Sequence, residues 1–210
     1  MPGQPIRVLI LFIVLPLAGA EFHAEPSIAL RYVFSNKWDI VVGGRARVVA
    51  GDNYWYDLSV YPFLRYQAHP RVRIYGGGFV TWVDVLDRRR SRLYRVSGGV
   101  EPTLYDGERV QLISRTGYER FFLPGLLPDF NRYRQRFRLR WVNRWSPYIS
   151  AEVFFRNSGV SKSRYGVGAR HRFVRRTSID IAYWYEAVDL AGAGIRHMLA
   201  LTWNVNFHEH

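Results

Sequence analysis

The fold is decided by the stretch Arg132-Tyr133-Arg134-Gln135-Arg136-Phe137-Arg138-Leu139-Arg140-Trp141. Arginine fills every even position, and mostly apolar or aromatic side chains fill the odd ones. Successive side chains of a β-strand point to opposite faces, whereas a helix would scatter these arginines around its circumference. The stretch therefore predicts a strand with one cationic and one apolar face. At about 3.3 Å per residue the arginines span roughly 27 Å, close to the ~30 Å hydrocarbon core of a bilayer.

The two faces of this strand require different surroundings. An arginine that faces lipid near the bilayer midplane costs about 2–4 kcal/mol. Several of them would exceed the net stability of most domains, which is about 5–15 kcal/mol. The arginine face must therefore meet water or acidic partners, and the apolar face can meet lipid. A soluble barrel has the reverse polarity, and periodicity alone does not separate the two. The expected signal peptide, the long strands and an aromatic content of 16% favour a membrane barrel.

A period of two recurs along most of the chain. In the last segment Leu199, Leu201 and Trp203 share one face, opposite a mostly polar face. We predict strands at 27–35, 38–49, 54–66, 71–85, 92–103, 108–121, 131–143, 147–156, 163–173, 177–187 and 195–207. Short turns alternate with longer loops between them, which is typical of outer-membrane barrels.

Bacterial single-chain barrels have even strand numbers, whereas these segments make an odd set. Either 27–35 is not a full wall strand, or 71–86 has a break at Gly76-Gly77-Gly78. The expected fold class is all-β, a single antiparallel transmembrane β-barrel of about 10–12 strands, preceded by a cleaved signal peptide.

Residues 1–20 have the features of a secretory signal peptide. Arg7 is their only charge, 8–17 are apolar, and Ala18-Gly19-Ala20 forms a small-x-small cleavage site. The alternative, an uncleaved anchor helix, needs about 20 apolar residues. We expect a signal peptide over 1–20 and one barrel domain over 21–210, located in the bacterial outer membrane.

Composition excludes several classes of protein. The chain has 210 residues, a formal net charge of +13 and no cysteine. A disulfide scaffold, a thiolate metal site and a catalytic cysteine are therefore excluded. Single-stranded nucleic acid is bound by aromatic side chains set among basic ones, whereas here the aromatic side chains lie opposite the arginines. Together with export, this argues against a nucleic-acid partner.

The inward phase of the strands holds the candidate functional residues. The expected lumenal cations are Arg115, Arg132, Arg134, Arg136, Arg138, Arg140, Arg156 and Arg170. The expected acid partners are Glu101, Glu119, Glu152, Asp180 and Glu186. In one interpretation the guanidinium groups, which match carboxylate and phosphate, form a narrow anion-preferring channel or bind an anionic ligand. In the other, an Arg–Glu/Asp lattice plugs the lumen and the barrel is a structural scaffold. The excess of arginine over acid on this phase favours the first.

An outer-membrane lipid-modifying enzyme is the third, weaker alternative. Such a site needs a nucleophile, a histidine and an acid within hydrogen-bond reach, and no such set shares the inward phase. His171 and His197 fall on the outward phase, and His208 with His210 is only a terminal pair. We therefore expect no catalytic residues, no metal site and no cofactor.

Several motifs in the C-terminal half carry a family resemblance. They are Arg115-x-Gly117-x-Glu119, the arginine strand, Pro147-Tyr148, Glu152, Phe154-Phe155, Arg170, Trp184-Tyr185, and His197 before a closing apolar strand. Together they resemble the DUF2490 outer-membrane barrels, a bacterial family of uncharacterised function. The similarity covers about 90–207 well, whereas the N-terminal half shares only the alternating pattern of its strands. It departs at Gly117, where the family usually has arginine. The resemblance implies an outer-membrane barrel and supplies no activity.

The closing strand ends at Phe207, and this resembles the assembly signal of outer-membrane proteins. The expected partners are the assembly machinery, outer-membrane lipid, lipopolysaccharide and small anionic solutes.

Overall fold

The chain forms a closed β-barrel. The computed structural model describes residues 21–49, 55–85, 89–125, 128–157, 159–174, 176–188 and 194–208. Within these residues all regular structure is strand, and the strands number 11. They are β1 (Glu21–Val33), β2 (Trp38–Val49), β3 (Trp55–His69), β4 (Val72–Val85), β5 (Arg89–Asp106), β6 (Val110–Phe122), β7 (Phe130–Trp141), β8 (Trp145–Arg156), β9 (Gly159–Val174), β10 (Thr177–Val188) and β11 (Gly194–His208). No helix in this part of the chain is long and apolar enough to cross a membrane. The expected signal peptide, residues 1–20, lies outside the described residues.

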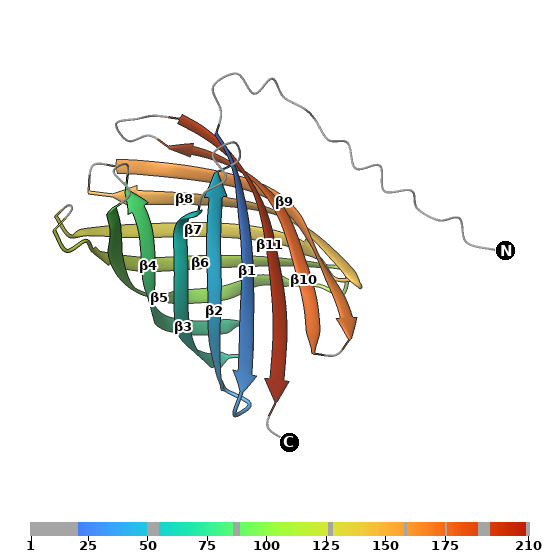
Figure 1. Cartoon of the computed structure of the whole chain (residues 1–210). Helices are drawn as coiled ribbons and strands as arrows, with labels where there is room; N and C mark the ends of the chain where they lie inside the picture. The colour runs from blue at the N-terminus through green and yellow to red at the C-terminus, as the bar shows by residue number, and fades with distance from the viewer. Residues whose placement is uncertain are drawn as a thin grey trace.

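Each strand pairs with its chain neighbours in antiparallel fashion, and β1 closes the barrel against β11 (Figure 1). That closing pair is parallel, with Glu21 opposite Arg196 and Val33 opposite His208. The 11 strands fall within the expected 10–12, whereas the expectation that the barrel is purely antiparallel is wrong at this pair. An up-and-down chain with an odd number of strands brings its first and last strands together in the same direction, so their pairing must be parallel.

Both ways of reaching an even number are also wrong. β1 is a full wall strand, and β4 pairs with β5 without interruption through Gly76, Gly77 and Gly78. The middle glycine gives room to β3. A Cβ at Gly77 would lie 2.1 Å from the Pro62 carbonyl oxygen and 2.8 Å from the Phe63 ring. The run therefore permits a close approach of two strands, which glycine allows because it lacks a side chain.

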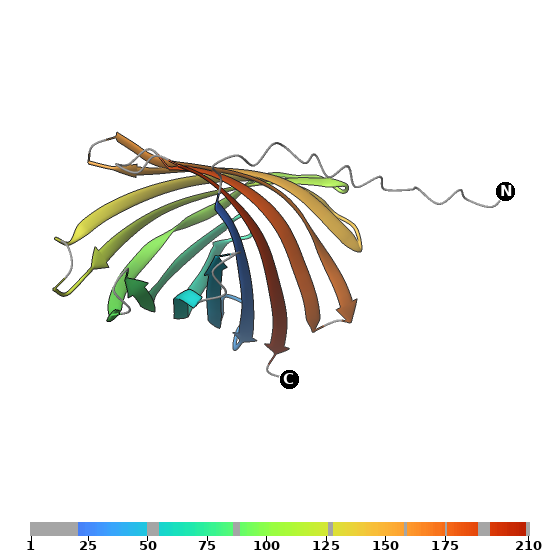
Figure 2. The same ribbon diagram turned by 45° about the horizontal axis from the view of Figure 1, so that its top comes forward.

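The connections differ between the two ends of the barrel. Residues 34–37, 70–71, 107–109 and 142–144 join strands at one end, where β11 also finishes. We call this the short-turn end. The opposite end of the barrel is called the loop end. It holds the start of β1 and the strand ends joined by 50–54, 123–129 and 189–193. Figure 2 shows the strands curving around one interior. Three loop-end connections are longer than any at the short-turn end, which resembles outer-membrane barrels, whereas 86–88 and 157–158 at the loop end are also short.

The polarity of the wall is the reverse of that in a soluble barrel. Leu58, Val96 and Trp203 point outward and are 50%, 58% and 53% exposed. Glu119 and Glu186 point inward and are 2% and 4% exposed. The apolar face therefore covers the outside, and the ionised side chains are enclosed.

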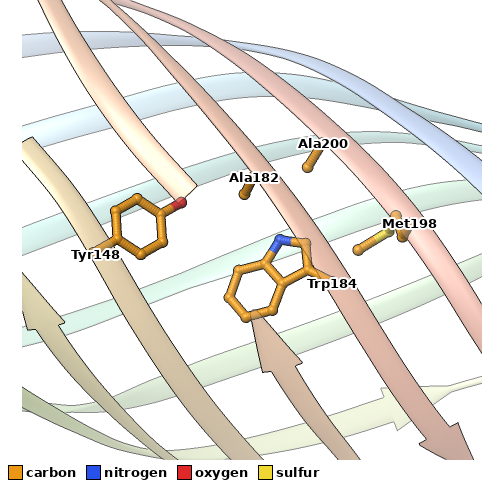
Figure 3. Close-up of a cluster of buried hydrophobic side chains, with 5 residues drawn as sticks. All are labelled: Tyr148, Ala182, Trp184, Met198 and Ala200. Carbon is orange, nitrogen blue, oxygen red and sulfur yellow. The ribbon is translucent and has the colours of Figure 1, made fainter. Parts of the chain in front are cut away.

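Part of the interior is filled by aromatic rings that lie over glycines of neighbouring strands. A Cβ at Gly166 would lie 2.3 Å from Trp184, and one at Gly168 would lie 2.6 Å from Tyr148. These rings belong to an inward cluster on β8, β10 and β11 (Figure 3), made of Tyr148, Ala182, Trp184, Met198 and Ala200. Trp184 therefore occupies lumenal space.

Single cysteines test which face each residue occupies, because the chain has none of its own. Cysteines on the outward phase should react with a lipid-soluble thiol probe: Tyr133, Phe137, Leu139, Val205 and Phe207. Cysteines on the inward phase should react with an aqueous probe or be shielded: Arg134, Arg136, Arg138 and Glu152. Labelling of both sets by the lipid-soluble probe would contradict the barrel.

A double cysteine variant tests the parallel closure. Ser27 of β1 and Thr202 of β11 stand opposite each other, with their hydroxyl oxygens 2.7 Å apart. We expect Ser27→Cys with Thr202→Cys to oxidise to an internal disulfide that changes gel mobility. The control, Ser27→Cys with Asn206→Cys, separates the thiols by about 13 Å, beyond the ~7 Å Cα limit of a disulfide. Equal cross-linking in both variants would exclude this register.

Candidate functional site

A continuous row of ionised side chains winds around the lumen. Strand register and ion pairs connect its members in order from β4 to β1: Arg73, Glu101, Arg115, Arg136, Glu152, Arg164, Glu186, Arg196 and Glu21. We call this the charge row. It starts near the short-turn end and finishes at the loop end, because a row across tilted strands climbs as it circles a barrel. Its signs alternate except where Arg115 stands beside Arg136.

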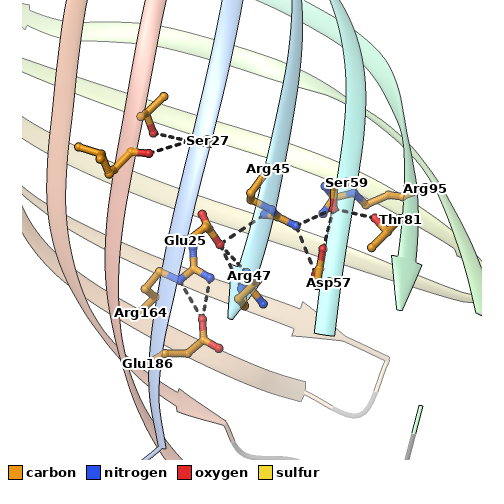
Figure 4. Close-up of polar contacts among 12 residues, drawn as sticks. Glu25, Ser27, Arg45, Arg47, Asp57, Ser59, Thr81, Arg95, Arg164 and Glu186 are labelled. Atoms are coloured by element: carbon orange, nitrogen blue, oxygen red, sulfur yellow. Dashed lines mark hydrogen bonds and ion pairs between the residues drawn. The ribbon is translucent and has the colours of Figure 1, made fainter. Parts of the chain in front are cut away.

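Most neighbours in the charge row are in direct contact. Glu101 lies 3.3 Å from Arg73 Nη1 and 3.5 Å from Arg136 Nη2. Arg164 Nη2 lies 2.6 Å from Glu186 Oε2 (Figure 4). Charge-assisted hydrogen bonds of this length are the strong ones in proteins. The row therefore ties together strands that are far apart in the sequence.

Glu119 forms a junction of ion pairs four residues along β6 from Arg115 of the charge row. Its carboxylate lies 2.6 Å from Arg132 Nη2 and 3.4 Å from Nη1 of both Arg95 and Arg134. Arg134 Nε also lies 3.1 Å from Glu152. A buried carboxylate is stable only when paired and hydrogen-bonded, and three guanidinium groups meet that requirement. This junction links β5, β6, β7 and β8.

The structure gives the predicted lumenal residues two kinds of partner. All five predicted acids contact a basic side chain. Five of the predicted arginines contact an acidic side chain: Arg115, Arg132, Arg134, Arg136 and Arg170. Among the described residues Arg138, Arg140 and Arg156 have no acid partner. Arg138 and Arg156 lie over the Tyr148 and Phe130 rings, 4.3 Å and 3.7 Å from the centroids, and Arg140 donates to Gln111.

Positive charge accumulates at the short-turn end. Arg138, Arg170 and Arg172 all act electrostatically on Arg140, opposed there by Asp106. We call these four arginines the cationic mouth. Arg170 is held by Asp180, through hydrogen bonds of 3.0 and 3.1 Å. Towards the loop end, by contrast, arginines and carboxylates alternate along the charge row.

Sequence reasoning missed three acids of the lumen, Glu21, Glu25 and Asp39, of which Glu21 ends the charge row. Glu25 Oε2 lies 2.7 Å from Arg47, and Asp39 Oδ2 lies 2.7 Å from Arg31. Glu25 was missed because β1 begins earlier than the predicted segment 27–35. Asp39 was missed because the apolar Val41 follows on the same phase. The sequence did contain a signal for Asp39, because it is an even number of residues from Arg47 and therefore lies on the same face of the strand.

His171 and His197 lie away from these charges, whereas the buried His23 contacts the charge row, with its Nε2 3.1 Å from Glu21 Oε2. His197 is buried on the outer face, where it hydrogen-bonds the Tyr183 hydroxyl, and His171 packs on Trp145. The described residues contain no group of three or more histidine, cysteine or acidic side chains able to hold a metal ion. The pair His208 and His210 falls outside the side chains that the structure describes.

Fold and lumen define this protein as an up-and-down β-barrel with an apolar outside and an ionised interior. Residues 26–196 match the family described as "Protein of unknown function (DUF2490)". The chain belongs to this family. No curated protein sequence matches it.

A solved structure described as "Bacterial polysaccharide outer membrane secretin" is similar, with a TM-score of 0.52 and 14% sequence identity. The alignment covers 80% of this chain and 64% of that one, so the chain spans less than two thirds of that neighbour's length. This likeness supports the barrel fold alone.

Replacing Glu119 tests the ion-pair lattice. Glu119→Gln would leave three arginines facing a neutral amide, and breaking such a buried pair costs about 3–5 kcal/mol. We expect the folded form in heat-modifiable gel electrophoresis to be lost at a markedly lower temperature. In the control, Asp129→Asn, the pair with Arg120 spans 3.9 Å and is about half exposed, so the change should stay within about 1 kcal/mol. Equal stability of the two variants would contradict the lattice.

Proposed function

We propose that this protein is an outer-membrane barrel whose lumen binds small anions at the cationic mouth. The observation that carries the proposal is that Arg138 and Arg140 have no acid partner in the described part of the chain, although they lie on the same strand face as paired arginines. Guanidinium groups with free donors match the geometry of carboxylate and phosphate.

Electrostatics supports anion uptake at this mouth. Arginines two positions apart on one strand face are about 6.7 Å apart. Two unit charges at that distance repel by about 2–3 kcal/mol at an effective dielectric of ~20. A bound anion between Arg138 and Arg140 removes part of this repulsion, and a cleft of one charge sign also raises the local concentration of counter-ions.

The lattice argues against a wide pore. The charge row, the Glu119 junction and the Trp184 ring occupy the interior between the two ends. The second candidate function is therefore a narrow anion-preferring path, favoured by the arginines at successive levels of β7. The remaining candidate is a plugged structural barrel. We propose no catalytic role.

The proposed location is the bacterial outer membrane, reached after removal of a signal peptide over 1–20. The apolar outer face, the difference between the two ends and the similarity to an outer-membrane protein support it. Lipid and lipopolysaccharide would then contact the outer face. The assembly machinery would recognise the closing strand, on which Phe207 faces outward.

Removing the two unpaired charges tests the proposal. We expect Arg138→Gln with Arg140→Gln to lower the affinity for inorganic phosphate at least tenfold, because two donors lose their charge. In planar bilayers with a salt gradient, any conductance should lose its anion preference. The unfolding temperature should change little, since neither side chain neutralises an acid.

The control for this experiment is Arg109→Gln with Arg144→Gln, which removes equal charge from exposed turns at the same end. It should leave phosphate affinity and reversal potential unchanged. Unchanged phosphate affinity and reversal potential in the mouth variant, together with a large drop in unfolding temperature, would favour the structural barrel.

A further inference from the structure

The lumen contains a cavity that is separate from the cationic mouth. It has a volume of about 300 Å³ and is lined by residues of β1 to β7 and β11. Small-molecule sites begin at about this size, so the space suits a ligand with a single ring. Its wall combines an aromatic surface with arginine and hydroxyl groups, and one of these arginines, Arg115, also belongs to the charge row.

Four aromatic rings on β3 and β4 form one side of the cavity. Phe79 lies with its ring centroid 5.0 Å from that of Tyr61 and 5.2 Å from that of Phe63. Tyr75 continues the surface, 6.0 Å from Phe63. We call these four residues the aromatic shelf. The rings are inclined to one another by 38° to 75°, so they offer an apolar surface of ring edges and faces against which another ring can pack.

Glycines on neighbouring strands hold the aromatic shelf in place. A Cβ at Gly43 would lie 2.4 Å from the Tyr61 ring, and one at Gly117 would lie 2.5 Å from the Tyr75 hydroxyl. That hydroxyl donates to the Thr116 carbonyl at 3.3 Å. Tyr61 and Tyr75 therefore lie over glycines of the wall and border the cavity.

Four residues that line the cavity carry a buried polar atom with no hydrogen-bond partner among the described residues: Ser97 Oγ and the Nε atoms of Arg45, Arg115 and Arg134. Ser97 is only 6% exposed. Arg115 lies over the Tyr75 ring at 4.0 Å, and its ion pair with Glu101 is long at 3.9 Å. Buried polar groups are nearly always hydrogen-bonded, so these donors lack an acceptor that a ligand would supply.

The charges on the cavity wall favour a monoanion. Glu25 and Glu119 also line it, but each is held at 2.7 Å or less by an arginine, Arg47 and Arg132 respectively. Their presence opposes a multiply charged ligand. Arg45 lies 3.6 Å from Asp57 and 3.7 Å from Glu25, and Arg115 lies 3.9 Å from Glu101. Because these ion pairs are long, the two guanidinium groups can take one further carboxylate. A phosphate dianion fits the cationic mouth better than this cavity.

We propose that the cavity binds a ring-bearing monocarboxylate, either an aromatic acid or a cyclic sugar acid. The carboxylate accepts hydrogen bonds from Ser97 and the arginines, and the ring packs on the aromatic shelf. This inference deepens the proposed anion-binding function by naming a ligand class, and it rests on that function.

Calorimetry tests the inference by measuring how four probes bind to the full chain refolded in detergent micelles. The probes are benzoate, glucuronate, acetate and glucose. We expect benzoate or glucuronate to bind at least tenfold more tightly than acetate, which lacks a ring, and glucose, which lacks the charge, to show no binding. Which of the two ring acids binds more tightly identifies the source of the ring.

The matched variants are Ser97→Ala and Ser150→Ala. Ser97→Ala removes a hydroxyl that has no partner within the described chain, so folding is kept while ring-acid affinity falls at least fivefold. Ser150 is equally buried but donates to the Phe137 carbonyl outside the cavity, so its variant should bind as the unmodified chain does. Equal binding of acetate and benzoate, or unchanged affinity in Ser97→Ala, would overturn the inference. If the unmodified chain binds phosphate but no ring acid, the cavity proposal alone is rejected. If it binds neither phosphate nor a ring acid, the proposed anion-binding function is rejected as well.

Discussion

The cost of exposing a guanidinium group to an apolar medium organises this barrel. On β7 the arginines occupy one phase over the full length of the strand, so the chain has a single acceptable orientation of that wall. A shift of one residue would turn every arginine outward and every apolar residue inward. The neighbours of β7 must then supply acids on the matching phase, and β6 and β8 do so with Glu119 and Glu152.

The odd number of strands also affects the ion pairs of the lumen. Because β1 and β11 run in the same direction, Glu21 and Arg196 meet at the loop end, where the charge row finishes. An antiparallel closure would bring the start of one strand beside the end of the other, and this final contact would not form. The parallel seam therefore belongs to the ion-pair arrangement as well as to the backbone pairing.

Periodicity predicted the fold class, the inward arginines and most of their acid partners, because each follows from strand alternation alone. Three features could not be predicted. The direction of closure depends on whether segment 27–35 starts early enough to complete the wall. The continuity of β4 depends on Phe63 filling the space above Gly77. The different partners of Arg136 and Arg138 depend on register between strands, since both residues look identical in the sequence pattern.

This last difference separates stability from binding within one strand face. Arg136 neutralises Glu101, so its charge is used by the fold, whereas Arg138 lies against the Tyr148 ring and keeps free donors. A cation over an aromatic face gains only about 0.5–2 kcal/mol, less than a charge-assisted pair gives in a buried site. An incoming carboxylate or phosphate can therefore compete for Arg138 without breaking an ion pair. Lattice and binding site are thus compatible: the paired arginines hold the wall in register, and the unpaired ones remain available because that wall is already rigid.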